Sequence, residues 1–330
     1  MAVISEIIID YLIIFKYYAI YLCKCFYEFF ITNKFKFRKK CKSNKRLDGK
    51  VVVITGGNTG IGKETALQLS LRGAKIIIGC RNVQKGEIAV QDIIAKNVLS
   101  DIRVLYLDLS SLSSVRQFAQ TVTQLVSKLD ILINNAGVMM TPESTTEDGF
   151  ELQFGTNFLA HFLLIHCLMP LLIKSSKARI VNLSSICHIL GKIHFNNINL
   201  KDGHYRPLKA YSQSKLAIVL MTREMARRLG TNTNITVYSL HPGVIQTEIT
   251  RHFPAYLYYL IKPFMTTIEL GTQTTLYCAI DETLDNQTGL YYDDCKRVNN
   301  MIAPAIDDNS AKKLWELATD LVNLEDSLKI

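Results

Sequence analysis

From residue 50 to the end of the chain, apolar and polar positions follow two alternating patterns. Short runs of β-branched and aliphatic residues predict strands at 51–55, 75–79, 102–107, 130–133, 178–183 and 235–240. Longer stretches with apolar residues three or four positions apart predict helices at 61–71, 83–96, 112–127, 150–173, 209–229, 268–280 and 303–324. This alternation predicts an α/β fold, a doubly wound parallel sheet with helices on both faces. Ser110 or Ser111 is the expected N-cap of the third helix.

Two segments interrupt the alternation, 186–208 and 244–267, and each begins just after a predicted strand. Doubly wound sheets bind their ligands beyond the carboxyl ends of the strands. The second segment is rich in aromatic residues, namely Phe253, Tyr256, Tyr258, Tyr259 and Phe264. These segments are candidates for the walls of a substrate site, and ordinary apolar core is the alternative.

The N-terminal region has a different pattern. Tyr11–Phe30 is apolar apart from three charged residues, and it is about as long as a helix needs to cross a bilayer. These charges and two acidic residues upstream fall on one helical face about 120° wide. Residues 1–49 are therefore expected to form a membrane anchor, spanning or interfacial, ahead of a catalytic domain at 50–330. A buried core helix is the alternative.

Charge is concentrated in the same region. The chain has a formal net charge of +9, and residues 1–50 contain eleven Lys and Arg against four acidic residues. The remainder is nearly balanced, so we expect no nucleic-acid partner. The positive-inside rule predicts that the basic cluster, and the domain after it, face the cytosol. That cluster consists of Lys34, Lys36, Arg38, Lys39, Lys40, Lys42, Lys45 and Arg46.

The eight cysteines show no paired spacing of the kind that binds metal ions. Reduced thiols in a cytosolic domain are therefore expected, with no metal site. A cleaved signal peptide is the weaker interpretation of the N-terminus, because no small-residue cleavage site is evident. The oligomeric state is left open, a homo-oligomer included.

A glycine-rich turn follows the first predicted strand and opens the first predicted helix. This context predicts a dinucleotide site, in which the helix N-terminus faces the pyrophosphate. Gly56 permits the tight turn, Gly60 lets the backbone approach the phosphates, and Gly62 allows close packing of helix on strand. The turn residues expected to contact the cofactor are Gly56, Asn58, Thr59, Gly60, Ile61 and Gly62.

The end of the second strand indicates which dinucleotide is bound. Sites that prefer NAD place a carboxylate there to hold the ribose 2′-hydroxyl. This chain instead has Cys80-Arg81-Asn82, and Arg81 would pair with a 2′-phosphate. The sequence therefore favours NADP(H), with an ordinary surface arginine as the alternative.

Four Tyr-x-x-x-Lys pairs occur, beginning at Tyr205, Tyr211, Tyr258 and Tyr292. Only Tyr211 and Lys215 open a long helical pattern, where they share one face. The nearby ammonium is expected to lower the pKa of Tyr211 and so prepare it for proton transfer. Ser185 ends a predicted strand and can hold a carbonyl group. Asn157 lies inside a predicted helix, where a buried hydrogen-bonding role is the usual one.

Together these motifs resemble the short-chain dehydrogenase/reductase family, in the order that the family has. The matching residues are the glycine-rich turn, Asn134-Asn135-Ala136-Gly137, Asn157, Ser185, Tyr211 with Lys215, and Pro242-Gly243 with Thr247. The resemblance implies one Rossmann domain with a seven-stranded sheet, whose last strand is supplied by 288–291. It also implies further cofactor contacts from Asp108, Leu109, Asn135, Ala136, Gly137, Tyr211, Lys215, Pro242, Gly243 and Thr247.

Several shorter stretches resemble the membrane-anchored retinol dehydrogenases, including Cys80-Arg81-Asn82 and Thr146-Glu147-Asp148-Gly149. That branch implies NADP(H)-dependent interconversion of retinal and retinol, reduction favoured, on the cytosolic face of a membrane, with the endoplasmic reticulum expected. The family implies that Tyr211 protonates the carbonyl oxygen, Ser185 positions it, Lys215 holds the ribose, and Asn157 supports a water relay. Lipid aldehydes or steroid ketones are alternative substrates. A silent NADPH-binding scaffold tethered to the membrane is the remote alternative.

Overall fold

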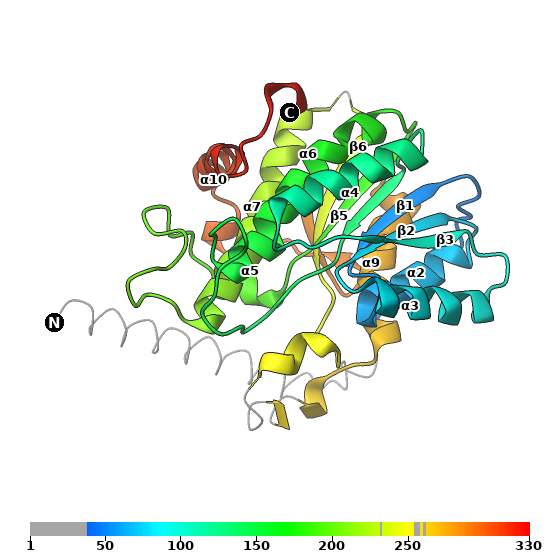
Figure 1. Ribbon diagram of the computed structural model, residues 1–330, viewed down its shortest axis with the longest axis horizontal. Helices are drawn as coiled ribbons and strands as arrows, with labels where there is room; N and C mark the ends of the chain where they lie inside the picture. Colours follow the sequence, from blue (N-terminus) through cyan, green and yellow to red (C-terminus); the bar gives the residue numbers. More distant parts are fainter. Residues whose placement is uncertain (1–37, 232, 254–257, 260–261) are drawn as a thin grey trace.

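A sheet of eight strands runs through the middle of the protein, in the order β3-β2-β1-β4-β5-β6-β7-β8 (Figure 1). The structure is a computed structural model that describes residues 38–231, 233–253, 258–259 and 262–330. Neighbours from β3 to β7 pair in parallel, which confirms the predicted sheet. The strands are β1 (Val51–Thr55), β2 (Lys75–Cys80), β3 (Ile102–Tyr106), β4 (Ile131–Asn134), β5 (Ala178–Leu183), β6 (Ile235–His241), β7 (Leu290–Asp293) and β8 (Lys296–Arg297).

The resemblance implied seven strands, and the structure adds β8 as an eighth. β8 pairs antiparallel with β7, and Asp294 and Cys295 join the two strands. Both joining residues have positive φ angles, 51° and 53°. Two consecutive residues of this kind form the turn that best suits a tight hairpin. The last parallel strand therefore lies slightly later than the expected 288–291 and is followed by a short return strand.

Helices cover both faces of the sheet (Figure 1). The longer ones are α2 (Gly60–Ser70), α3 (Val83–Lys96), α4 (Leu112–Leu125), α6 (Ala160–Ile173), α7 (Pro207–Leu229), α9 (Ile268–Ile280) and α10 (Asp308–Leu321). The shorter ones are α5 (Leu152–Phe154), η2 (Gly155–Leu159), η3 (Ile186–Leu190), η4 (Glu248–His252), η5 (Lys262–Phe264), η6 (Glu282–Leu284), η7 (Ala303–Ala305) and η8 (Asp326–Leu328). On one face α2 packs against α9, and on the other α4 packs against α6 and α7 against α10.

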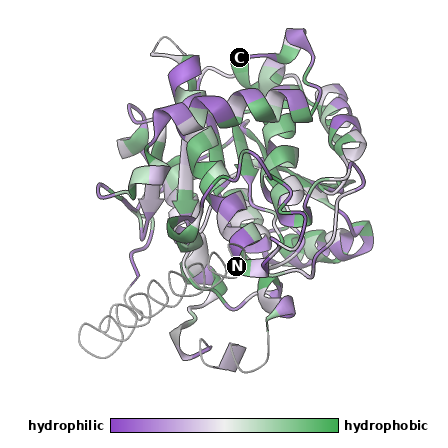
Figure 2. Cartoon of the chain, turned by 90° about the vertical axis from the view of Figure 1, so that its left-hand side faces the viewer, coloured by the Kyte–Doolittle hydropathy of each residue, from purple (hydrophilic) through white to green (hydrophobic). Residues whose placement is uncertain are grey.

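Two apolar cores follow from the alternation of side chains along the strands. Val51 and Val53 of β1 point into the core beneath α4, α6 and α7, whereas Val52 and Ile54 point into the core beneath α2 and α9. Successive strand residues face opposite sides of a sheet, so a strand buried on both faces is apolar throughout. Figure 2 shows the matching pattern on the helices, with hydrophobic residues turned inward and polar residues outward.

The predicted helix over 150–173 is confirmed as a continuous helical stretch, Leu152–Ile173, but it is not α-helical throughout. A π-helical turn, η2, lies between α5 and α6, and the backbone N–H of Ala160 donates to the carbonyl of Gly155, five residues earlier. Such turns accommodate an extra residue within a helix and often mark functional sites. Leu152–Ile173 is also the one stretch among the described residues that is long and apolar enough to cross a membrane. Since 83% of its most apolar window is buried inside the protein, it is a core element.

Several helix ends differ from the predicted positions for local reasons. α7 begins at Pro207, two residues before the predicted start, because proline suits the first position of a helix. Ser111 is the N-cap of α4, as expected, and its hydroxyl accepts from the N–H of Ser114. The last helix is shorter than the predicted 303–324, because Asp307 caps its N-terminus and residues 303–305 form a separate turn.

Residues 38–49 lie against the domain that was expected to begin at residue 50. Leu47 is buried in the core beneath α2, and its N–H donates to Arg72. Much of the basic cluster is paired with this domain, including Arg38 with Asp293 at 2.7 Å. The predicted anchor, Tyr11–Phe30, lies outside the described residues.

Candidate functional site

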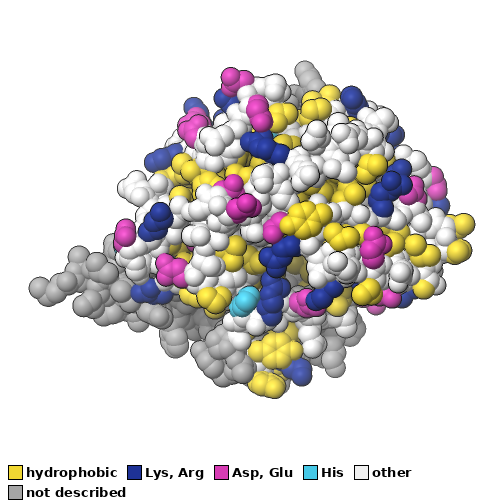
Figure 3. All heavy atoms as spheres, viewed as in Figure 1, with side chains coloured by type: hydrophobic (Ala, Val, Ile, Leu, Met, Phe, Trp, Pro, Cys, Tyr) yellow, Lys and Arg dark blue, Asp and Glu magenta, His cyan; other side chains and the backbone are white. Residues whose placement is uncertain are grey.

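One cavity of about 900 Å³ lies at the carboxyl ends of the strands. Its walls come from the segments that follow β1, β2, β3, β4, β5 and β6. The strand order reverses between β1 and β4, and such a reversal is where doubly wound sheets bind ligands. The surface view in Figure 3 shows a hollow in the lower part of the molecule, with Lys and Arg side chains along its border.

The cavity brings together nearly all of the predicted site residues. Ser185 and every predicted cofactor residue line it, namely Gly56, Asn58, Thr59, Gly60, Ile61, Gly62, Arg81, Asn82, Asp108, Leu109, Asn135, Ala136, Gly137, Tyr211, Lys215, Pro242, Gly243 and Thr247. Asn157 is the exception, since it is fully buried behind the wall. Residues from six different loops therefore converge on one site.

The glycine-rich turn has the shape that a dinucleotide needs. Gly56 has a φ of 67°, and a Cβ added at Gly62 would overlap the carbonyl oxygen of Gly56, so neither position accepts a larger residue without strain. Asn135 braces the turn, because its Nδ2 donates to the carbonyl of Thr55 at 2.8 Å. The N-cap of α2, Thr59, makes no side-chain cap, so the first amides of the helix can bind an anion. These features fit the pyrophosphate of a dinucleotide.

The end of β2 gives the cavity a basic wall. Arg81 and Lys85 both line it, and residues 79–85 contain no Asp or Glu. Asn82 caps α3 by accepting from the N–H of Lys85 at 2.8 Å, which places Lys85 in the first turn beside Arg81. The sequence analysis missed Lys85 as a site residue. Its position four residues after Arg81, at a predicted helix start, was the available signal.

Tyr211, Ser185 and Lys215 meet at the other side of the cavity. Ser185 is the N-cap of η3, just beyond β5, and its side chain interacts with that of Tyr211. Lys215 follows Tyr211 by one turn of α7, and its Nζ donates to the carbonyl of Leu183 at 2.9 Å. That Nζ lies 5.6 Å from the centroid of the Tyr211 ring. A hydroxyl pair is thus held beside a buried ammonium group.

Burial governs the acidity of these groups. It raises the pKa of Tyr211 above its ordinary value, and the Ser185 side chain opposes that rise. Burial also lowers the pKa of Lys215 to about 8. The expectation that Lys215 lowers the pKa of Tyr211 is wrong for this structure, because burial of the phenol raises that pKa. Tyr211 keeps its proton at neutral pH.

Asn157 connects elements behind the cavity wall. Its Nδ2 donates to the carbonyl of Val138 at 2.9 Å and to the hydroxyl of Ser214 at 3.0 Å. Its Oδ1 accepts from the N–H of Val138 at 2.8 Å. The π-helical turn presents this side chain to both partners, so Asn157 fastens the segment after β4 to the helix that carries Tyr211 and Lys215.

His161 is a second connecting residue that the sequence analysis missed. Its Nε2 lies 2.9 Å from the hydroxyl of Thr55, and its Nδ1 lies 3.0 Å from the carbonyl oxygen of Asn157. Burial lowers the pKa of His161 to about 4, so the ring is neutral at pH 7. A lone histidine in an apolar helix carries little signal in a sequence, because its partners come from other elements.

Part of the cavity wall is apolar, and a residue of the predicted substrate lobe belongs to it. Phe253 lines the cavity, whereas Tyr258 and Tyr259 lie outside its wall. Tyr256 lies outside the described residues. Side chains that the sequence analysis did not single out complete this part of the wall, namely Met139, Met140, Leu152, Ile189, Leu190, Leu208 and Ile249.

The competing tyrosines have other roles in the structure. Tyr205 donates to the carbonyl of Thr141 at 2.7 Å, and Tyr292 donates to Gln287 at 2.8 Å from within β7. Among the described residues, no group of three or more His, Cys, Asp or Glu side chains is placed to hold a metal ion. The six cysteines in the described ranges are free thiols.

Comparison with known proteins places the chain in a class. The sequence profile of the short chain dehydrogenases matches residues 50–256. The chain therefore belongs to the short-chain dehydrogenase family, whose members are oxidoreductases that use a nicotinamide cofactor. Known proteins that it resembles include retinol dehydrogenase 12 of Mus musculus, 47% identical over 287 residues that span 86% of this chain and 90% of that protein. Retinol dehydrogenase 11 of Homo sapiens is 45% identical over 286 residues, with coverage of 86% and 89%. The sequence thus lies on the retinol dehydrogenase branch of the family.

Solved structures agree on the fold. A crystal structure of an uncharacterized protein from Mycobacterium Paratuberculosis matches with a TM-score of 0.70 and 35% identity, over 85% of this chain and 96% of that one. The NADP active-site complex of RhlG from Pseudomonas aeruginosa matches with a TM-score of 0.59 and 26% identity, over 74% and 94% of the two chains. Both cover most of the described domain.

Proposed function

We propose that this protein is an NADP(H)-dependent oxidoreductase that interconverts retinal and retinol, with reduction favoured. One observation carries the proposal: a single cavity joins a basic wall, a hydroxyl pair beside a buried ammonium, and an apolar part of the wall. The resemblance to retinol dehydrogenases supports a retinoid as the apolar substrate.

The basic wall supports the choice of NADP(H). Arg81 and Lys85 would pair with the 2′-phosphate, and a guanidinium and an ammonium group both bind phosphate well. The glycine-rich turn would hold the pyrophosphate on the amides of α2. Contacts from the segments after β3, β4 and β6 would hold the rest of the dinucleotide.

When bound, the nicotinamide supplies the hydride that adds to the carbonyl carbon of the substrate. Tyr211 donates its hydroxyl proton to the carbonyl oxygen as that oxygen gains charge, which completes the alcohol. Ser185 donates a hydrogen bond to the same oxygen and fixes its position. Lys215 binds the nicotinamide ribose and stabilises the negative charge that Tyr211 gains. Asn157 supports the relay that returns a proton to Tyr211 and positions α7 through Ser214.

Tyr211 is protonated at neutral pH, as the reduction of a carbonyl requires of the residue that donates the proton. The apolar part of the cavity wall, with Met139, Met140 and Phe253, supports a long hydrocarbon substrate.

The setting of the enzyme is part of the proposal. Residues 1–49 would anchor it to a membrane, with the endoplasmic reticulum as the proposed host and the catalytic domain in the cytosol. An apolar substrate dissolved in the bilayer would then be close to the cavity. A homo-oligomer is compatible with this arrangement.

The decisive experiment is the initial rate of NADPH oxidation by the full-length protein in detergent, with all-trans-retinal as the substrate. NADH in place of NADPH tests the cofactor, and Tyr211→Phe tests the acid. Turnover that needs Tyr211 and is much faster with NADPH would support all parts of the proposal. Activity on hexanal or nonanal without activity on retinal would assign the site to lipid aldehydes. NADPH binding without turnover on any carbonyl substrate would contradict the proposal.

A further inference from the structure

Arg38 occupies the space beside Gly243 where any other residue would place its side chain. A Cβ added at Gly243 would lie 2.7 Å from the guanidinium carbon of Arg38 and would overlap one of its nitrogens. Gly243 also has a φ of 104°, which L side chains rarely adopt. The guanidinium therefore packs directly on the backbone of the segment that follows β6.

Two carboxylates hold this guanidinium in place. Arg38 Nη2 donates to Asp293 at 2.7 Å, and its Nε lies 3.6 Å from Asp294. The Arg38 side chain is only 12% exposed, whereas the two acids are about one-third exposed. The backbone N–H of Lys39 also donates to Asp294 at 2.8 Å. Charge-assisted hydrogen bonds to a partly buried guanidinium fix its orientation more firmly than an exposed pair would.

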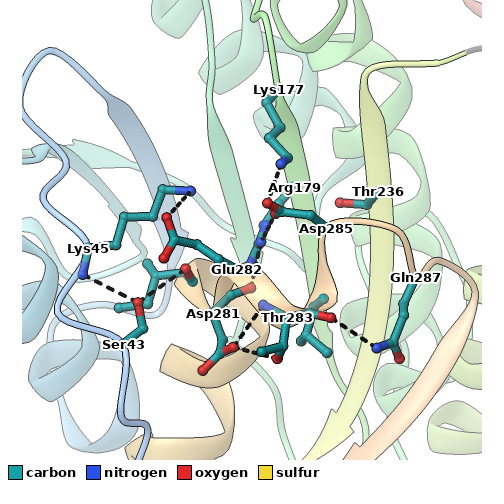
Figure 4. A network of polar contacts seen from close by, with 12 residues as sticks. Ser43, Lys45, Lys177, Arg179, Thr236, Asp281, Glu282, Thr283, Asp285 and Gln287 are labelled. Atoms are coloured by element: carbon teal, nitrogen blue, oxygen red, sulfur yellow. Dashed lines mark hydrogen bonds and ion pairs between the residues drawn. The ribbon is translucent and has the colours of Figure 1, made fainter.

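Arg38 is the first described residue of a segment that follows the surface of the domain. We call residues 38–46 the strap. The N–H of Cys41 donates to Gln273 of α9 at 3.1 Å, and Lys40 pairs with Glu269 at the same distance. Figure 4 shows Ser43 and Lys45 of the strap beside the turn that follows α9. The strap is therefore docked along α9 and up to the β7–β8 hairpin.

The segment beyond Gly243 lines the cavity, while Arg38 lies outside the cavity wall. A backbone bridge joins Ile245 to Thr266, and the carbonyl of Val244 accepts from the N–H of Thr266 at 2.9 Å. Further along, the methyl group of Thr247 lies against Gly60 of the glycine-rich turn, 3.1 Å from where a Cβ would stand. Pro242–Thr247 therefore contacts Arg38 on its outer side and the glycine-rich turn on the side of the cavity.

We propose that Arg38 is a positioning residue for the cofactor: it holds Pro242–Thr247 against the bound NADP(H). This inference rests on the proposed function, since it takes the segment to be part of the dinucleotide site. Arg38, at one end of the strap, is then a component of that site and not part of a passive linker to the membrane. Arg38 lies outside the cavity wall, so we expect it to affect cofactor binding more than the chemical step.

The test compares three variants of the full-length protein in detergent. Arg38→Met removes the guanidinium but keeps the apolar stem, Arg38→Lys keeps a positive charge, and Lys40→Met removes an exposed charge from the same strap. The dissociation constant of NADPH is measured from its fluorescence, and KM and kcat are measured with retinal or the best aldehyde. Arg38→Met is expected to raise the dissociation constant and KM for NADPH about tenfold, with kcat within about twofold. Arg38→Lys should recover part of the loss, and Lys40→Met should match the wild type.

The split between KM and kcat separates positioning from general damage. A poorly folded variant would lose active protein, so kcat would fall while KM for NADPH stayed the same. If Arg38→Met does not fold, Asp293→Asn takes its place in the test. This substitution weakens the Arg38–Asp293 ion pair and leaves the guanidinium present. An unchanged NADPH affinity in the folded variant, beside a wild type that binds NADPH, overturns this inference alone. A wild type that does not bind NADPH overturns the proposed function instead.

Discussion

Ser185 and Tyr211 bring their hydroxyl groups to the same cavity although they come from different layers of the protein. Ser185 follows a strand of the sheet, and Tyr211 lies in the first turns of a helix that covers it. Each hydroxyl is both a donor and an acceptor, so a carbonyl oxygen can receive a hydrogen bond from either. The pair is therefore a preformed site for one oxygen atom.

Removal of the Tyr211 hydroxyl should abolish most of the turnover. Without a positioned acid, Tyr211→Phe is expected to lower kcat by about 10²- to 10⁴-fold, while NADPH binding changes little. Initial rates with retinal and NADPH fluorescence measure the two effects. Tyr292→Phe is the matched control, because Tyr292 begins another Tyr-x-x-x-Lys pair but donates to Gln287 far from the cavity. Near-normal turnover in Tyr211→Phe would eliminate this residue as the acid.

The basic wall should determine which dinucleotide is used. Arg81→Asp replaces an attractive charge with a repulsive one, so KM for NADPH should rise by roughly tenfold or more. KM for NADH should fall or stay constant, because the new carboxylate can accept from the 2′-hydroxyl. Arg103→Asp, on the exposed side of β3, introduces the same charge change away from the cavity. Equal effects of the two substitutions would show that Arg81 has no special role.

The ionisation of Lys215 should set the alkaline limit of the activity. Its pKa of about 8 means that the ammonium is lost above that pH, and with it the charge that binds the ribose and supports Tyr211. We expect kcat/KM to fall as pH rises through about 8, as measured by a pH–rate profile. Lys215→Arg keeps its charge over this pH range, so its kcat/KM should not fall in the same way, even if its turnover is slower. A profile for the wild type that is flat up to pH 10 would contradict the assignment.

The lowered pKa of Lys215 should change the stability of the protein in the opposite direction from its activity. The pKa of Lys215 falls from 10.5 to about 8 on folding, so between these values the unfolded chain binds more protons. The free energy of unfolding contributed by this group should therefore increase as pH rises from 8 to 10.5. Activity and stability thus change in opposite directions over this range, which distinguishes loss of a catalytic charge from alkaline unfolding.

A buried histidine should make the fold sensitive to acid. Burial lowers the pKa of His166 from 6.5 to about 4, so the unfolded chain binds the extra proton between these values. Stability should then fall as pH decreases from 6.5 to 4, and His161 adds to the effect. His166→Leu should reduce the loss of urea midpoint between pH 7 and pH 5, whereas the exposed His252→Leu should not.

The fluorescence of Trp315 measures this unfolding well, because it is the only tryptophan and its ring lies 5.1 Å from that of His166. An acid sensitivity in His166→Leu equal to that of the wild type would show that the histidine is not its source.

The positions of the strands along the chain and the position of the cofactor turn could be predicted because both depend on neighbouring residues. A strand buried on both faces is apolar throughout, as in β1, and the glycines of the turn are required by backbone geometry close by. Tyr211 could be separated from the other tyrosines because the helix that follows it has its own periodicity. The two-residue β8 escaped prediction, since Cys295 stands where such a turn usually has a glycine.

Other features depend on partners far away in the chain, and no local pattern indicates them. The direction of the Tyr211 pKa shift depends on how deeply the group is buried, which follows from the whole of α7 and the segment after β5. The π-helical turn at Asn157 is stabilised by bonds to Val138 and Ser214. The positive-inside rule assigns the basic residues after the predicted anchor to the cytosolic side, but no local pattern indicates that Arg38 pairs with Asp293.

The Arg38–Asp293 pair joins residues that are 255 positions apart. Closing so long a loop is entropically costly, and Asp293 is the last residue of β7, which pairs with β6. During synthesis Arg38 leaves the ribosome 255 residues ahead of Asp293, so the contact cannot form until Asp293 has emerged. If Arg38 positions Pro242–Thr247 as proposed, this part of the cofactor site reaches its final arrangement only then.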